Sequence, residues 1–194
     1  FAAAVAGGIV HTGSIPVRHL VEGTFTYFDI CLIFITATVF INLLKEAGGI
    51  SFMVRSIIKT FHERRFLCLL FLTIVLLIPG ALTGAGAATV LTVGTLVGTV
   101  LTYMGISKTR TTAIIFVCAT MSAAAPPVNL WAMMTAAGAN MPYVGFMQPL
   151  LVLSVAGALI AMFTLGGKGT PVDLDKALAE LPEPPEDMNW YRVL

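Results

Sequence analysis

Charged side chains are scarce in this 194-residue sequence and are missing from two long stretches of it. Asp, Glu, Lys and Arg make up 11% of the residues, against about a quarter in a typical soluble domain. None of the four occurs in residues 66–107 or in residues 111–167. A run of about 18 apolar residues without charge indicates a transmembrane helix. The composition therefore excludes an ordinary soluble domain and predicts an all-α integral membrane protein.

Residue patterns that carry enzyme or nucleic-acid chemistry are also missing. The three His and three Cys show no metal-ligand spacing, and the sequence has no GxSxG, HExxH or P-loop motif. Lys and Arg are spread over several connections without interleaved aromatic residues, which argues against a nucleic-acid partner. We therefore expect a protein of the lipid bilayer that is not an enzyme and needs no cofactor beyond a transported ion.

Apolar segments and polar connections divide the chain into two predicted parts. Residues 1–167 form a transmembrane repeat, and residues 168–194 form a polar linker toward a second repeat. Within the repeat, a connection over 11–23 leads to a helix over 24–44, which is long enough to cross at about 1.5 Å per residue. Apolar and basic residues alternate at helical spacing over 50–63, which predicts an interfacial amphipathic helix.

The Gly-rich stretch IPGALTGAGAATV interrupts the first charge-free run. Basic residues flank this run on both sides, which places both flanks in the cytoplasm. The 66–78 segment spans only about 20 Å as a helix, which is too short to cross the bilayer. Pro79 and Gly80 are expected to end it, and a second helix over 87–103 returns the chain.

These observations predict a re-entrant helical hairpin over residues 66–103, with its tip at residues 80–86 near mid-membrane. Irregular backbone at that depth must be buried in protein or line a cavity. The alternative is a pair of ordinary crossing helices joined by a Gly-rich turn outside the membrane.

The stretch CATMSAAAPPVNLWAMM marks a second interruption, in a broken helix over residues 107–138. Two adjacent prolines remove two backbone donors and disfavour helical conformation before them. We expect a helix over 107–122, an unwound segment over 123–127 and a second half-helix that begins near Pro127. The alternative is a plain proline kink.

Discontinuous helices at mid-membrane depth are typical of transporters, because their free carbonyls can coordinate Na⁺ while their amide ends attract anions. Hydroxyl and amide oxygens also suit an alkali cation, and small residues let two backbones approach closely. The predicted cation- and substrate-binding residues are Gly80, Thr83, Gly84, Ala85, Gly86, Thr89, Ser122, Ala125, Pro126, Pro127 and Asn129. The positions predicted for Na⁺ among them are Gly80, Thr83, Gly84 and Ser122.

Three polar side chains near these positions have an alternative, structural role. Thr89 and Thr92 can donate back to carbonyls of their own helix, and Asn129 can cap the half-helix after the prolines. No Lys or Arg lies in either interruption, so a carboxylate contact to substrate is expected from the other half of the transporter.

The stretch LIPGALTGAGAATVLTVGTLVGTVLTYMGISKTRTTAIIFVCATMSAAAPPVNL resembles the first half of the large membrane subunit of tripartite ATP-independent periplasmic (TRAP) transporters, in the ion transporter superfamily. The hairpin with a small-residue tip and the helix broken at Pro-Pro carry the resemblance, which covers about residues 11–165. Two departures are Ala85-Gly86 after Gly84 and Val128-Asn129 after the prolines, where the family usually or often has serine. Backbone carbonyls would survive these changes as Na⁺ ligands.

The resemblance implies one inverted repeat of a secondary transporter, with a second copy in the same chain or in another chain. It further implies Na⁺-coupled symport of a small organic anion such as a dicarboxylate, across a bacterial inner membrane. A periplasmic solute-binding protein and a small membrane subunit would be the partners. Citrate- or gluconate-type permeases of the wider superfamily are one alternative, and a non-transporting membrane scaffold subunit is another.

Overall fold

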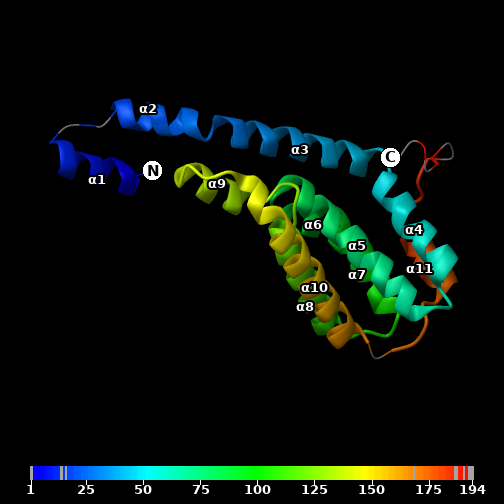
Figure 1. The fold of residues 1–194 in the computed structure, drawn as a ribbon. Coiled ribbons are helices and arrows are strands. Elements are labelled where there is room, and N and C mark those ends of the chain that lie inside the picture. The colour runs from blue at the N-terminus through cyan, green and yellow to red at the C-terminus, as the bar shows by residue number, and fades with distance from the viewer. Residues whose placement is uncertain are drawn as a thin grey trace.

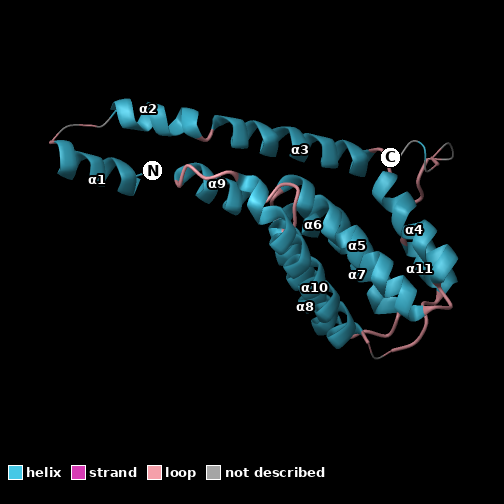
Figure 2. Cartoon of the chain, in the orientation of Figure 1, coloured by secondary structure: helices cyan, strands magenta, loops and turns pink. Residues whose placement is uncertain are grey.

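The computed structural model describes residues 2–13, 15, 17–167, 169–185, 188, 189 and 191. Every regular element in this part of the chain is helical, as predicted (Figure 2). The elements are α1 (Ala2–Thr12), α2 (Val17–Thr26), α3 (Phe28–Glu46), α4 (Gly49–Phe61), α5 (Arg65–Thr83), α6 (Gly86–Thr89), the π-helix η1 (Val90–Gly94), α7 (Thr95–Tyr103), α8 (Lys108–Ala124), α9 (Leu130–Gly138), the 3₁₀-helix η2 (Tyr143–Phe146), α10 (Met147–Gly166) and α11 (Leu174–Glu180).

Four helical segments of the described chain are long and apolar enough to cross a membrane. They are Phe28–Glu46, Arg65–Thr83, Gly86–Tyr103 and Tyr143–Gly166. The last three lie in a bundle with α8, and α3 runs along one end of this bundle (Figure 1). The length, composition and arrangement of these helices define a multi-pass membrane protein.

The bundle core consists of large aliphatic side chains from four helices. Its fully buried members include Leu69, Leu72 and Leu76 of α5, Val97 and Leu101 of α7, Ile114 of α8 and Met162 of α10. Cys68 and Cys118 are buried as free thiols and pack as small apolar groups, whereas the free thiol of Cys31 is exposed.

Helix α5 runs through Pro79, so the prediction that this proline ends the helix was wrong. The helix ends instead at Gly84, which has φ +68° and donates from its N–H to the carbonyl of Gly80 at 2.6 Å. Packing against α3, α4, α8 and α10 holds both sides of the proline in helical conformation. The 19 residues of α5 extend about 28 Å, so the first arm is not too short to cross the bilayer, contrary to the prediction. The depth of the tip in the bilayer stays a prediction.

The predicted break in the second interrupted helix is real and is not a simple kink. Helix α8 continues to Ala124 and α9 begins only at Leu130, so the non-helical segment is 125–129 rather than 123–127. The prolines lie within this segment, joined by a cis peptide bond, and do not start the second half-helix. Asn129 takes the capping position because its side chain can accept a hydrogen bond from the first turn of α9, which proline cannot do.

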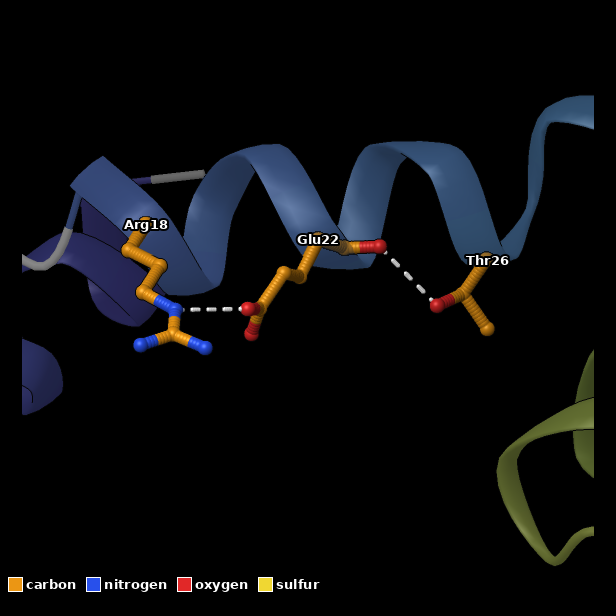
Figure 3. Close-up of polar contacts among 3 residues, drawn as sticks. All are labelled: Arg18, Glu22 and Thr26. Carbon is orange, nitrogen blue, oxygen red and sulfur yellow. Dashed lines mark hydrogen bonds and ion pairs between the residues drawn. The ribbon is translucent and has the colours of Figure 1, made fainter.

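The predicted connection over residues 11–23 is largely helical. Helix α1 extends to Thr12 and α2 occupies Val17–Thr26, while Pro16 lies outside the described residues. In α2 an exposed ion pair joins Arg18 to Glu22 at 2.7 Å, one turn apart (Figure 3). The Thr26 hydroxyl donates to the Glu22 carbonyl at 2.9 Å in the next turn. These local contacts are of the kind that support a surface helix.

Helix α4 has the amphipathic pattern that its sequence predicts, but its apolar face covers protein. Ile50, Val54 and Ile58 of this face are at most 1% exposed. They pack in the core cluster with α5 and α7 and with the short helix α11. Helix α11 forms within the polar tail, and the side chain of Asp173 caps its first turn.

The guanidinium of Arg65 forms hydrogen bonds with three chain segments at the end of the bundle opposite the hairpin tip. Its guanidinium donates to the carbonyl of Met104 at 3.0 Å and also to those of Gly166 and Thr170. The Met104 carbonyl follows α7, the Gly166 carbonyl lies at the end of α10, and the Thr170 carbonyl belongs to the tail. One side chain therefore joins three segments of the chain to the start of α5. Cationic groups interact favourably with the carbonyl ends of helices.

Candidate functional site

The tip of the hairpin and the break between α8 and α9 pack directly on one another. The N–H of Val128 donates to the carbonyl of Ala81 at 3.0 Å. A Cβ atom added at Gly84 would lie 2.8 Å from the Leu130 nitrogen and 3.0 Å from the Val128 carbonyl oxygen. Only glycine fits this gap and its left-handed φ. The sequence alone left open whether the two interruptions face each other, and the structure places them in contact.

A buried chain of hydrogen bonds crosses the contact between the hairpin and α8. The Gly80 N–H donates to the Thr89 hydroxyl at 3.0 Å, and the Thr89 and Ser122 hydroxyls lie 2.7 Å apart. The side chains of Thr89 and Ser122 have no exposed surface. Thr89 therefore does not bond back to its own helix. It accepts the backbone N–H of the outgoing arm and holds the returning arm against α8.

Two further glycines set how closely these helices approach. A Cβ atom at Gly80 would lie 2.6 Å from the Ser122 Cβ, and one at Gly86 would lie 2.7 Å from the Ala119 carbonyl oxygen. Ala85 lies between the two arms of the hairpin and has an extended backbone at φ −133°. The small residues predicted at the tip are thus explained by backbone contact with α8.

The remaining predicted hydroxyls serve local structure. Thr83 donates to the Pro79 carbonyl at 2.8 Å and accepts the Ala85 N–H at 3.3 Å, which secures the turn at the tip. Thr92 donates to the Ala88 carbonyl at 2.6 Å, so for this residue the structural alternative was right.

Asn129 acts as the cap of α9. Its side-chain oxygen accepts the Ala132 N–H at 2.9 Å, and its amide nitrogen donates to the Ala124 carbonyl at 2.9 Å. The side chain thereby bridges the two half-helices across the break. Its own N–H donates to the Tyr143 hydroxyl at 3.3 Å. Sequence reasoning missed Tyr143, because nothing in the pattern of the turn at residues 138–142 relates it to the prolines.

Several carbonyl oxygens at this contact have no donor. Within the described part of the chain, no hydrogen bond reaches the carbonyls of Gly84, Ala125, Pro126, Pro127 or Val128. Gly84 follows the C-terminus of α5 and Ala125 follows that of α8, and each helix end carries roughly half a negative charge. Free carbonyls at two adjacent helix C-termini provide neutral oxygen ligands for a cation and need no carboxylate.

The candidate site residues that the sequence predicted thus separate into three groups. Glycines and Ala85 allow close approach, Thr89 and Ser122 join the helices, and the carbonyls of the break accept no hydrogen bond from the described residues. Irregular backbone buried between apolar helices is tolerated only inside a protein or beside a cavity. A hairpin and a broken helix that meet in this way define a membrane transporter of the secondary carrier type.

A comparison with protein-family models identifies the particular family. Residues 7–166 match the model for DcuC, the C4-dicarboxylate anaerobic carrier. The match covers most of the chain, and the chain therefore belongs to this family. It is a dicarboxylate permease of the broad kind that the sequence predicted, but the narrower resemblance to the large TRAP subunit is not confirmed. Neither the curated proteins nor the solved structures yield a match to this chain.

Proposed function

We propose that this chain forms one inverted repeat of a secondary carrier that moves a C4-dicarboxylate across a bacterial inner membrane. The family to which it belongs is that of a C4-dicarboxylate carrier. The second repeat would lie in the rest of the same protein or in another chain. Alternating access in such carriers takes place around a site at the interface of two repeats. The contact between the hairpin tip and the α8–α9 break is the part of that site which this repeat supplies.

We further propose that Na⁺ is the coupling ion and binds at this contact. The observation that supports it is the set of unpaired carbonyls at Gly84 and at residues 125–128, next to the ends of two helices. Gly80, Thr83 and Ser122, which the sequence analysis also predicted for Na⁺, use their polar atoms within the protein. The cation would therefore be held mainly by backbone oxygens.

Uptake by the full-length carrier in proteoliposomes tests both statements. Radiolabelled succinate should accumulate inside the vesicles when a Na⁺ gradient points inward, and an inward K⁺ gradient should have no effect. Accumulation that follows an inward proton gradient at equal Na⁺ would overturn sodium coupling but not dicarboxylate transport. Citrate or gluconate uptake without succinate uptake would assign the chain to another permease of the same superfamily.

A tripartite system is a second candidate, which the resemblance of residues 77–130 to TRAP transporters favours. It would add a periplasmic solute-binding protein and a small membrane subunit. The two candidates differ in one measurement. The carrier alone should transport succinate in proteoliposomes, whereas a tripartite transporter would be inactive until both partners are added.

A further inference from the structure

Lys45, near the end of α3, makes a contact that the hairpin sequence does not suggest. Its ammonium donates to the carbonyl of Leu91 at 2.9 Å, and Leu91 lies in the π-helical turn η1 of the returning arm. π-helical turns are rare and occur frequently at functional sites. Leu91 is six residues beyond Ala85 at the tip, or about 9 Å along the helix axis. The ammonium therefore lies beside the hairpin and within about two turns of its tip.

The charge of Lys45 is not neutralised by any acidic group of the described residues. Among the described cations, Arg18 pairs with Glu22, Lys176 pairs with Asp173, and Arg55 donates to two carbonyls at the end of α11. Lys59, Arg64, Lys108 and Arg110 also have no acidic partner among the described residues, but of these unpaired cations Lys45 is the one that contacts the hairpin. An ammonium has three donors, and the described structure uses one of those of Lys45. Two N–H groups and a full positive charge remain for a ligand.

A cavity of about 630 Å³, with apolar and polar residues in its lining, opens next to the Lys45–Leu91 contact. Its polar side chains are Lys45, Glu46, Ser51, Thr92, Thr95 and Glu183. Glu183 lies 3.7 Å from the guanidinium of Arg55, so part of its charge is balanced. The residues 182–185 of the tail border the cavity on one side, and η1 borders it on the other. The cavity is larger than a four-carbon molecule and has hydroxyls on the η1 side.

We infer that Lys45 binds one carboxylate of the transported dicarboxylate in this cavity, which rests on the proposed function above. A carboxylate would replace a neutral carbonyl as the acceptor of the ammonium, and a charge-assisted hydrogen bond is the stronger one. The hydroxyl of Thr95 stands on the same wall and can contact the anion, whereas the hydroxyl of Thr92 already donates to the Ala88 carbonyl. Glu46 lines the cavity as well and repels the anion. Lys45 is thus a specificity-determining residue for doubly charged substrates.

The test compares substitutions of opposite electrostatic effect in the full-length carrier in proteoliposomes. Lys45→Gln should raise the KM for succinate by about tenfold to a hundredfold, the value of one charge-assisted hydrogen bond. Lys45→Arg should restore part of this loss. Glu46→Gln should lower the KM because it removes a repulsive charge. The matched control is Lys108→Gln, since Lys108 is an exposed lysine at the start of α8, outside this cavity.

The monoamide of succinate separates a binding role of Lys45 from a structural one. Wild-type carrier should prefer succinate to the monoamide, and Lys45→Gln should reduce that preference. A lower maximal rate with unchanged KM and unchanged preference would overturn the inference and leave Lys45 as a structural link between α3 and η1. If the wild type transports no dicarboxylate at all, it is the proposed function that fails.

Discussion

The hydroxyls of Thr89 and Ser122 lie 2.7 Å apart, although 33 positions separate the two residues in the chain. This contact joins the returning arm of the hairpin to the first half of the broken helix. Because Thr89 also accepts the N–H of Gly80, the three groups form one buried unit that belongs to both interruptions. Removing the Thr89 hydroxyl takes one buried hydrogen-bond partner from each of the other two groups.

Thr89→Val should destabilise the protein by about 1–3 kcal/mol, because the Gly80 N–H and the Ser122 hydroxyl then lose a buried partner. Thr92→Val is the matched control, since the Thr92 hydroxyl bonds only to the Ala88 carbonyl of its own arm. Thermal unfolding in detergent measures both. Equal losses of stability in the two variants would show that the hydrogen bond to Ser122 of α8 adds no stability beyond that of a bond within one helix.

Gly80→Ala should cost about 1–3 kcal/mol through overpacking, because its Cβ would lie 2.6 Å from the Ser122 Cβ. The separation of α5 and α8 would have to increase. Gly145→Ala provides the comparison, as nothing lies within 4 Å of the atom added there. Calorimetric unfolding of the two purified variants measures the difference in stability between them. Equal stability of Gly80→Ala and Gly145→Ala would show that α5 and α8 do not pack closely at Gly80.

Asn129→Ala should loosen the first turn of α9 by about 1 kcal/mol, the usual cost of losing a helix cap. Asn129→Ser keeps an oxygen for the Ala132 N–H but loses the donor to the Ala124 carbonyl. Hydrogen exchange over residues 130–134 should therefore be fast in the alanine variant and nearly normal in the serine variant. Equal exchange in both would mean that the bridge to Ala124 matters more than the cap.

The docking of α11 should weaken at acid pH. Hydrogen bonding to the Lys176 side chain, with a second bond from its backbone N–H, lowers the pKa of Asp173 below its ordinary value. A lowered folded-state pKa stabilises the helix above the unfolded pKa of about 3.9, and this stabilisation is lost as pH falls through the folded value. Proteolysis of the tail should thus be independent of pH from 8 to about 5 and should rise below about 4. Asp173→Asn should remove this dependence.

Much of the architecture follows from the distribution of charge and small residues in the sequence. The two helical arms and the break between α8 and α9 were predicted from charge-free runs, glycines and paired prolines. The prediction that Pro79 ends the helix was wrong because it followed local propensity, which disfavours proline within a helix. The packing of α5 on four neighbouring helices outweighs that preference. Contacts between helices override local preferences, and the sequence pattern does not reveal these contacts.

The side-chain roles at the site could be predicted only as alternatives. Thr89 and Thr92 are three residues apart on one arm, yet one bonds to α8 and the other to its own helix. The choice depends on which face of the arm meets Ser122, and spacing alone does not give that orientation. Lys45 was overlooked for a related reason. It lies in a different segment from the hairpin, and only the fold brings it to Leu91.

The three carbonyl contacts of Arg65 affect how the hairpin can move. Because the guanidinium joins the end of α10, the residue after α7 and the tail to the start of α5, its hydrogen bonds oppose sliding of the two arms along their neighbours at that end. If the arms tilt about that end, the 19-residue arm α5 acts as a lever of about 28 Å. A rotation of about 10° at this pivot would carry the far end by about 5 Å, close to the rise of one helical turn. Small angular changes at the guanidinium are therefore enough to part Gly84 from Leu130.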